Sequence, residues 1–252
     1  MASTLLIRHL SKSFGALRAV DGVNINIEAG RVHSLIGPNG AGKTTVFNCV
    51  TGFLRPDTGQ VLLKGRDVTG WPAHRLVAAG LVRTFQITKI FLELTVLENV
   101  QLAVRSRLGA NFDFFHKART FRHAQSEAED ILRVVGLLEQ AELRGEQLAH
   151  GDKRVLEVAI GLALDPDVLL LDEPTAGMSR AETERIAELV RQIASRTSVL
   201  LVEHDTEVVL SISDQITVMT QGRVIAQGGP DAISKDPKVR DAYLGAVDAR
   251  EI

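Results

Sequence analysis

Hydrophobic and polar positions alternate at the start of the chain. Residues 5–10 and 20–27 show this alternation together with the β-branched content that is typical of strands. Residues 16–18 form the turn between them. The pattern therefore predicts an antiparallel pair of strands near the N-terminus.

A strand, a glycine loop and a helix come next. Residues 31–36 are a short apolar strand that ends at Gly37, and residues 43–51 predict a helix that Gly52 closes. The glycine loop therefore lies between a predicted strand and a predicted helix. Shorter elements follow, namely a turn over residues 56–59, a strand over 60–64, a helix over 72–80 and a strand over 81–85.

From residue 94 to residue 164, apolar positions recur at helical spacing and strand alternation is largely absent. Examples are Ala128, Ile131, Leu132, Val135 and Leu138. We expect this stretch to form a helical subdomain.

Strand signals return after the helical stretch. Residues 168–171 and 199–202 are apolar strands separated by an amphipathic helix over residues 180–194, which predicts a βαβ unit with a parallel sheet. A hairpin over 216–220 and 223–227 and two short helices over 230–233 and 237–244 complete the chain.

The predicted fold class is α/β, with a mainly parallel sheet, an N-terminal antiparallel β subdomain and an inserted α-helical subdomain. No internal repeat or low-complexity linker divides the chain, so we expect residues 1–252 to form a single domain. Within it, residues 1–93 and 165–252 form the α/β core with the β subdomain, and residues 94–164 form the helical subdomain.

Composition narrows the possible functions only slightly. A hydrophobic fraction of 45% is enough for a sizeable core, and 29 basic against 31 acidic residues offer no argument for nucleic-acid binding. The single cysteine, Cys49, is expected to be a buried core thiol. No signal-peptide pattern is present, and no apolar run approaches the roughly 20 residues that a membrane span needs. We therefore expect a cytosolic protein whose membrane-spanning part, if it works at a membrane, belongs to a partner.

A phosphate loop is the clearest motif of the sequence. Glycines allow backbone N–H groups to curl around phosphate oxygens, and the positive end of the following helix adds to the attraction. Lys43 is expected to reach the β and γ phosphates of ATP, and the Thr44 hydroxyl to bind Mg²⁺. The predicted ATP-binding run comprises Gly37, Pro38, Asn39, Gly40, Ala41, Gly42, Lys43, Thr44 and Thr45.

Two carboxylates follow the predicted strand over residues 168–171. Asp172 and Glu173 should lie at the carboxyl edge of the sheet, where ligands of α/β proteins bind. Alone, an acidic pair at the end of a strand is often a helix cap or a turn. With a phosphate loop upstream, we expect Asp172 to hold Mg²⁺ and Glu173 to polarise the attacking water.

Three further residues are candidates by position. His204 follows the next strand, one βαβ unit beyond Glu173, which favours contact with the γ phosphate over a purely structural role. Gln86 follows the strand over 81–85, where it could reach the metal or the water, or be an ordinary polar edge residue. Phe14 in the first hairpin could stack on adenine or belong to a satellite core.

In order and spacing, the motifs from Phe14 to His204 resemble the nucleotide-binding subunits of ABC transporters over essentially the whole chain. The resemblance implies an ATPase with a P-loop NTPase core that uses ATP and Mg²⁺. It makes Phe14 the adenine-stacking aromatic, Gln86 the sensor glutamine and His204 the switch histidine. In that family two such domains pair head to tail, and each ATP lies between the phosphate loop of one and the signature segment of the other.

The signature segment departs from the family pattern Leu-Ser-Gly-Gly-Gln. Ala149 lacks the hydroxyl that would bind the γ phosphate, and losing one hydrogen bond to a charged group, roughly 1.5 to 3 kcal/mol, predicts a weaker half-site. Gly151 still offers a backbone N–H at the start of a helix. Ser179 is a second departure, because the family usually has an acidic or amide residue there. The signature segment comprises Leu148, Ala149, His150, Gly151 and Asp152.

Residues 37–52, 83–86 and 94–100 resemble, more narrowly, the ATPase subunits of branched-chain amino acid uptake systems. The long segment over 105–122, which includes Phe112, Phe114 and Phe115, also suits the longer of the two ATPases in that subgroup. This resemblance implies a second ATPase subunit and transmembrane permease subunits as partners, and a periplasmic binding protein indirectly. It places the chain peripherally at the cytoplasmic face of the inner membrane.

Other functions compete with this one. A soluble ABC ATPase acting on nucleic acid or the ribosome usually carries two cassettes or long coiled-coil inserts, and 252 residues with a net charge of -2 provide neither. A P-loop metabolic kinase does not explain a signature-like helix before Asp172 and a histidine after the next strand. The sequence does not distinguish importers of urea or amides, because specificity lies in other subunits.

Overall fold

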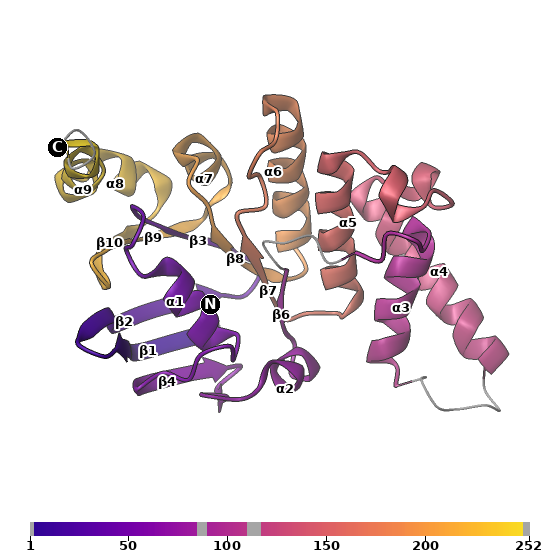
Figure 1. The fold of residues 1–252 in the computed structure, drawn as a ribbon, viewed down its shortest axis with the longest axis horizontal. Helices are drawn as coiled ribbons and strands as arrows, with labels where there is room; N and C mark the ends of the chain where they lie inside the picture. The colour runs from indigo at the N-terminus through magenta and orange to yellow at the C-terminus, as the bar shows by residue number, and fades with distance from the viewer. Residues whose placement is uncertain (1–2, 85–89, 110–116, 249–252) are drawn as a thin grey trace.

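The computed structural model describes residues 3–84, 90–109 and 117–248. Two sheets organise these residues, a four-stranded one in the order β2-β1-β4-β5 and a six-stranded one in the order β10-β9-β3-β8-β7-β6 (Figure 1). The predicted sensor Gln86 lies outside the described residues, as do Phe112, Phe114 and Phe115.

The smaller sheet is antiparallel, as the alternating N-terminal pattern predicts. Its strands are β1 (Ser3–Phe14), β2 (Leu17–Glu28), β4 (Thr58–Leu63) and β5 (Arg66–Asp67). β1 pairs antiparallel with both β2 and β4. Alternate positions of the second half of β2 are buried, so one face of this sheet packs on the core.

The larger sheet is mainly parallel. β3 (Val32–Ile36), β8 (Ser198–Val202), β7 (Val168–Asp172) and β6 (Leu81–Arg83) run in the same direction, and β9 (Gln215–Thr220) joins them beside β3. β10 (Arg223–Gly228) closes the edge as the antiparallel half of the predicted hairpin. Because parallel strands place their carboxyl ends at one edge, the segments that follow β3, β7 and β8 meet there.

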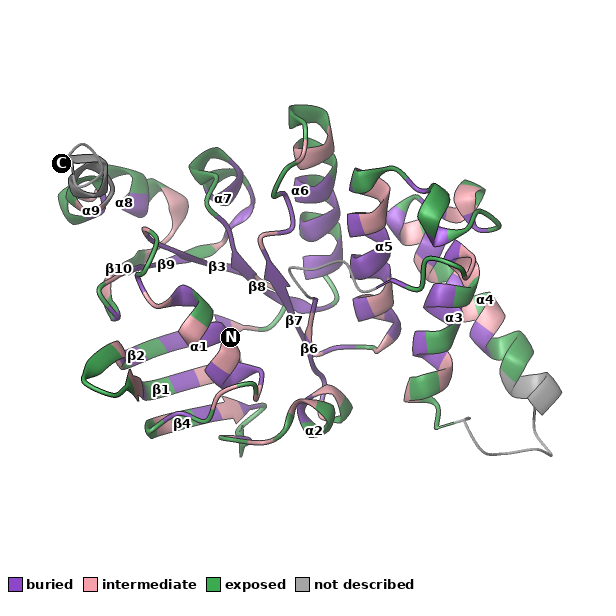
Figure 2. Cartoon of the chain, viewed as in Figure 1, coloured by how far each residue is buried: buried purple, intermediate pink, exposed green. Residues whose placement is uncertain are grey.

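The central strands are buried along their whole length, as Figure 2 shows for β3, β7 and β8. Alternate residues of β7 pack in different clusters: Leu169 and Leu171 pack with the helical stretch, and Val168 and Leu170 pack with Phe47 of α1 and the antiparallel sheet. Cys49 belongs to the second cluster, and burial raises the pKa of its thiol to about 11. The prediction of a buried core thiol is confirmed.

Helices flank the larger sheet: α1 (Lys43–Val50), α2 (Ala73–Ala78), α6 (Arg180–Ala194), α7 (Thr206–Ile212), α8 (Pro230–Lys235) and α9 (Pro237–Asp248). Ser179 begins α6 through a capping box with Glu182, in which each side chain accepts a hydrogen bond from the other residue's backbone N–H. Ser179, the second departure from the family pattern, is therefore a helix cap in this chain.

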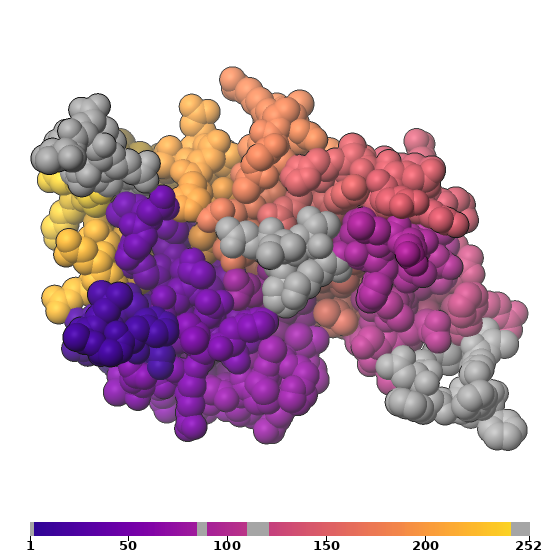
Figure 3. Space-filling model, viewed as in Figure 1, coloured from indigo at the N-terminus to yellow at the C-terminus, as the bar shows by residue number. Residues whose placement is uncertain are grey.

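The middle of the chain is helical: α3 (Val96–Arg107), α4 (Lys117–Val135), the 3₁₀ turns η1 (Leu138–Gln140) and η2 (Gly145–Gln147), and α5 (His150–Ala163). These helices share one hydrophobic cluster with β7 and α6. Figure 3 shows them, in magenta to red, at the opposite end of the molecule from the yellow C-terminal helices. The predicted α/β class with an inserted helical part is confirmed.

Candidate nucleotide-binding site

The phosphate loop passes between β3 and α1 in very close contact with two other strands. A Cβ on Gly37 would lie 2.1 Å from the carbonyl oxygen of Met219, and one on Gly42 would lie 2.5 Å from that of Ala19. Gly42 also has a φ of 101°, which residues with a Cβ rarely adopt. Glycine is therefore required at both positions by packing against β9 and β2.

The outer face of the loop is open. Asn39, Gly40 and Thr44 are exposed, and Thr45 is half-buried. Gly42 is the N-cap of α1 and makes no side-chain cap hydrogen bond. The first N–H groups of α1 are therefore not capped by a side chain of the N-cap residue, and such a helix start is suited to bind an anion. The Thr44 hydroxyl lies in the first turn of this helix.

Lys43 connects the loop to the predicted carboxylates. Its Nζ donates hydrogen bonds to the carbonyl oxygens of Gly37 at 2.6 Å and Pro38 at 3.1 Å. Burial lowers the pKa of Lys43, while the charges of Glu173 and Asp172 act to raise it. The ammonium group is thus within electrostatic reach of both carboxylates, and the structure brings the two predicted halves of the site together.

Asp172 ends β7 and is only 4% exposed. Its Oδ2 accepts a hydrogen bond from Nη2 of Arg83 at 2.7 Å, which makes a buried ion pair. Arg83 was not predicted as a site residue from the sequence. The signal that could have found it is a basic residue inside an otherwise apolar strand, next to the strand that ends in the acidic pair.

Asp172 carries a carboxylate and Thr44 a hydroxyl, and both kinds of oxygen fit Mg²⁺. This ion accepts carboxylate and hydroxyl oxygens and usually takes only one or two protein carboxylates, with the remaining ligands from water and substrate phosphates. Within the described ranges, no group of three or more His, Cys, Asp or Glu side chains could hold a metal ion. The phosphate oxygens of a bound nucleotide would supply further ligands to such an ion.

Glu173 and His204 meet at the carboxyl edge of the sheet. Nε2 of His204 is hydrogen-bonded to Oε1 of Glu173 at 2.7 Å. The N–H of Glu173 donates to the carbonyl oxygen of Val202 at 2.8 Å, and its φ is 48°. A left-handed conformation in a residue with a Cβ is costly and persists where the surroundings hold it, so the direction of the Glu173 side chain is strongly constrained.

Glu203 supports this arrangement and was not predicted. It is 3% exposed, and its Oε1 accepts hydrogen bonds from both the N–H and the hydroxyl of Thr175, at 2.9 and 2.7 Å. Its Oε2 accepts from the N–H of His204 at 3.1 Å. One buried carboxylate therefore joins the turn after Glu173 to His204, which lies two residues before α7. A carboxylate next to a candidate histidine was the available signal.

Phe14 lies at the end of β1, in the hairpin whose second strand contains Ala19. Its side chain is 47% exposed, and Lys12 Nζ lies 5.8 Å from its ring centre. The same hairpin touches the phosphate loop, because the Ala19 carbonyl packs against Gly42. Phe14 is thus available to a ligand and is not a buried core aromatic.

The signature segment forms the start of α5. Leu148 and Gly151 are buried, and Ala149 is an N-cap without a side-chain hydrogen bond. Asp152 pairs with Arg185 of α6, with 2.7 Å between Oδ1 and Nη1. In Figure 1 α5 lies beside α6 and apart from α1, so the structure does not bring these residues to the loop of the same chain.

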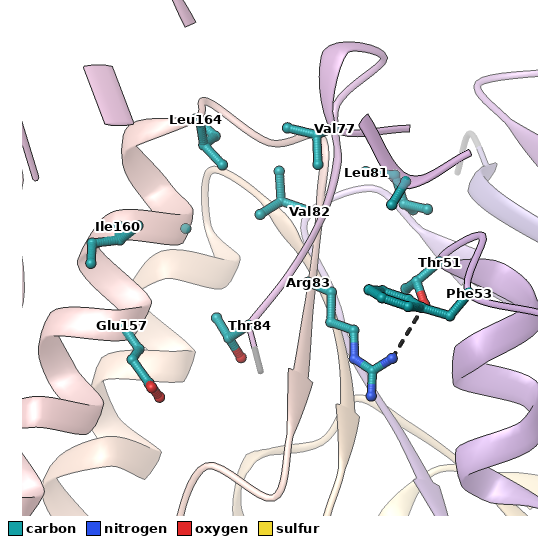
Figure 4. Close-up of a pocket in the computed structure, with 12 residues that line it drawn as sticks. Thr51, Phe53, Val77, Leu81, Val82, Arg83, Thr84, Glu157, Ile160 and Leu164 are labelled. Carbon is teal, nitrogen blue, oxygen red and sulfur yellow. Dashed lines mark hydrogen bonds between the residues drawn. The ribbon is translucent and has the colours of Figure 1, made fainter. Parts of the chain in front are cut away.

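A cavity of about 210 Å³ opens between β6 and α5. Val77, Leu81, Val82, Ile160 and Leu164 give it largely apolar walls, and Arg83 and Phe53 face each other at one end (Figure 4). Phe53 is 53% exposed. In the part of the chain that the structure describes, no helix is both long and apolar enough to cross a membrane.

The fold and the site define a P-loop ATPase. Residues 20–176 match the family model described as ABC transporter, and the chain belongs to this family. Residues 223–249 match a second model, described as branched-chain amino acid ATP-binding cassette transporter.

Individual relatives agree with this assignment. The chain is 44% identical to the high-affinity branched-chain amino acid transport ATP-binding protein LivG of Escherichia coli K12, over 96% of this chain and 97% of that protein. It is 43% identical to the corresponding protein BraF of Pseudomonas aeruginosa, with the same coverage. Among solved structures, the ADP conformation of MJ1267, an ATP-binding cassette of an ABC transporter, has a TM-score of 0.85 and 29% identity over 97% of this chain and 100% of that one.

Proposed function

We propose that this chain is the ATP-hydrolysing subunit of an ABC importer and powers the uptake of branched-chain or related amino acids through a partner permease. The observation that carries the proposal is the 44% identity to LivG over 96% of the chain. The joint placement of Lys43, Asp172, Glu173 and His204 supports the ATPase part.

The phosphate loop and its helix bind the nucleotide in this proposal. Backbone N–H groups of the loop and the start of α1 surround the phosphates, and Lys43 exchanges its bonds to Gly37 and Pro38 for the β and γ phosphate oxygens. Thr44 and Asp172, with Gln86, would hold Mg²⁺, which would neutralise charge on the phosphates. Phe14 stacks on adenine from the hairpin.

Glu173 and His204 act on the attacking water and the γ phosphate. Glu173 accepts the proton of the water as general base, and the histidine, 2.7 Å away, holds the carboxylate in position and contacts the γ phosphate. Glu203 holds the segments that contain Glu173 and His204 together, because it accepts hydrogen bonds from Thr175 and from the backbone N–H of His204.

The second wall of the ATP site comes from another ATPase subunit paired head to tail. The signature segment at the start of α5 lies away from the chain's own phosphate loop, and it serves the nucleotide of the partner through Gly151 and the helix start. Ala149 supplies no hydroxyl, so this half-site is the weaker of the two when the partner has serine there. The isolated chain is therefore expected to bind MgATP and hydrolyse it slowly.

A permease docks next to the site, at the cytoplasmic face of the inner membrane. The cavity between β6 and α5 is lined by Thr84, two positions before Gln86 in the sequence, and has apolar walls with an exposed Phe53 at its end. Such a surface suits a short amphipathic helix of a membrane subunit. A periplasmic binding protein delivers the solute on the other side, and nucleic acid has no part in this function.

Reconstitution tests the proposal. The chain is combined in lipid vesicles with a second ATPase, permeases and a binding protein of a branched-chain amino acid importer, and ATP hydrolysis and uptake of labelled leucine, isoleucine and valine are measured. Uptake that needs ATP and stops with Lys43→Ala supports the proposal. Stimulation by urea or short amides and not by these amino acids would assign the same subunit to a different importer.

A further inference from the structure

Arg83 contacts Asp172 on one side and the cavity on the other. It is the last residue of β6, and its pairing in the sheet places it opposite Leu170 of β7, two residues before Asp172. Its Nη2 donates to Asp172 Oδ2 at 2.7 Å, with side-chain exposures of 12% for Arg83 and 4% for Asp172. The pair is therefore well shielded from water. In this buried environment its charges interact more strongly than they would at the surface.

Other contacts restrict the position of the guanidinium group. Nη1 donates to Asn48 Oδ1 at 2.7 Å, in α1, the helix that the phosphate loop begins. The rings of Phe47 and Phe53 each lie with their centre 5.5 Å from its central carbon, a geometry for cation–π attraction. Arginine suits this position because its planar fork can serve two acceptors and still stack on rings.

One polar atom of this side chain makes no hydrogen bond. Among the described residues, Nε of Arg83 is buried without a partner. Such an atom carries a desolvation penalty, which a surface arginine would avoid. An arginine is present at the end of the cavity in spite of this penalty. A side chain that only filled the space would not need a charge.

We infer that Arg83 is a positioning residue, which holds the Asp172 carboxylate for the metal of MgATP and links its orientation to the cavity wall at Phe53; the inference rests on the proposed function. The ion pair uses one carboxylate oxygen, Oδ2, and restricts the rotation of the group. Mg²⁺ requires near-ideal octahedral geometry, so a fixed carboxylate favours its binding. Because the guanidinium group of Arg83 contacts both the Phe53 ring and the Asp172 carboxylate, a movement of Phe53 would shift the guanidinium group and, with it, the carboxylate.

Nucleotide binding without turnover tests this role. In a Glu173→Gln background, the Kd of ATP is measured by calorimetry for the isolated chain with Mg²⁺ and with EDTA, and the ratio of the two values gives the gain that the metal provides. Arg83→Gln is expected to reduce this gain about tenfold, while the Kd in EDTA stays within about twofold of the parent. Arg83→Lys keeps the positive charge but lacks the planar guanidinium fork, so its gain from Mg²⁺ should lie between those of the parent and of Arg83→Gln.

Two further variants keep the test decisive if Arg83→Gln folds poorly. Asn48→Ala removes one acceptor of the guanidinium group, and Phe53→Ala removes the ring on the cavity side. Neither touches Asp172 directly, and each should lower the gain by about twofold to fivefold. The matched controls are Arg133→Gln, which breaks an exposed ion pair in α4, and Phe91→Ala, which removes an exposed ring elsewhere.

An unchanged or larger gain from Mg²⁺ in folded Arg83 variants overturns the inference. Equal effects of Phe53→Ala and Phe91→Ala would overturn the link to the cavity. If the parent chain does not bind ATP in EDTA or with Mg²⁺, the proposed function fails, which is a different result from ATP binding that is indifferent to Arg83.

Discussion

Oε1 of Glu173 lies 2.7 Å from Nε2 of His204, although 31 positions separate the two residues in the chain. The contact exists because β7 and β8 are adjacent parallel strands, so the residues that follow them emerge at the same edge. Glu173 adopts a left-handed backbone conformation there, with a φ of 48°. A strained residue that is hydrogen-bonded to a histidine beside a phosphate loop is a structural reason to expect catalysis at this point.

Replacement of Glu173 by Gln should separate binding from hydrolysis. The amide keeps the shape of the side chain and cannot accept the proton of the attacking water, so kcat should fall by about 10²-fold or more. ATP should then trap a dimer, which size-exclusion chromatography with light scattering would detect. Undiminished phosphate release by this variant, measured in the assembled transporter, contradicts the assignment of the base.

His204→Gln should lower kcat less than Glu173→Gln does. The glutamine can donate one hydrogen bond to the carboxylate but lacks the shape and reach of the imidazole ring, and about a tenfold loss is expected. The Kd of ATP in EDTA should remain close to that of the parent, because the phosphate loop is intact. His123→Gln, on the exposed side of α4, is the matched control. Equal kcat values for His204→Gln and His123→Gln would show that His204 has no role in the mechanism.

Gly42→Ala should abolish tight ATP binding and destabilise the fold. The added Cβ would lie 2.5 Å from the Ala19 carbonyl oxygen, and the φ of 101° is unfavourable for alanine. Gly65→Ala has a similar φ of 79° and nothing within 4 Å of the added Cβ, so it isolates the backbone cost. We expect Gly65→Ala to cost about 1 kcal/mol of unfolding free energy with normal ATP binding, and Gly42→Ala to cost more. Similar losses in both variants, with ATP binding preserved, would contradict this.

Glu203→Gln should reduce both stability and turnover. The buried carboxylate accepts three hydrogen bonds, two from Thr175 and one from the His204 N–H. Loss of its charge weakens these bonds, at a cost of about 1.5 to 3 kcal/mol in the unfolding free energy. Thr175→Val removes the hydroxyl bond alone and should lie between the parent and Glu203→Gln. Urea denaturation and steady-state kinetics measure the two effects, and normal kcat in a destabilised Glu203→Gln protein would make Glu203 purely structural.

His33 makes the stability of the chain sensitive to acid. The ring is buried, with Nε2 2.8 Å from the Thr217 hydroxyl, and burial lowers its pKa from 6.5 to about 4. Between these values the unfolded chain binds a proton that the folded chain does not. This contribution to stability is therefore fully present above pH 6.5 and is lost as pH falls towards 4, by about 3 kcal/mol in all.

Comparison of two variants isolates the His33 effect. His33→Gln should flatten the pH dependence of the unfolding free energy between pH 6.5 and 4, while His123→Gln should leave it unchanged. Chemical denaturation at a series of pH values measures both slopes. Identical slopes for the parent and His33→Gln would show that other groups cause the acid sensitivity.

Features that depend on neighbours along the chain were predictable from the amino-acid sequence. The phosphate loop is a continuous run between a strand and a helix, and its glycines and Lys43 are enough to predict phosphate binding. The antiparallel start, the βαβ unit and the helical middle follow from periodicity, which burial of one face or both imposes locally. Asp172 and Glu173 were predictable because a buried strand ends at them.

Contacts between residues that are distant in the sequence could be found only in the folded chain. Arg83 and Asp172 are 89 positions apart, Thr175 and Glu203 are 28 apart, and neither pair has a pattern along the chain. Their contacts depend on the order β8-β7-β6 in the sheet, which hydrophobic periodicity does not specify because all these strands are apolar. The polar residues at their ends therefore acquire partners only when the sheet is assembled, and the same burial that hides the strand order from the sequence makes those ion pairs and hydrogen bonds strong.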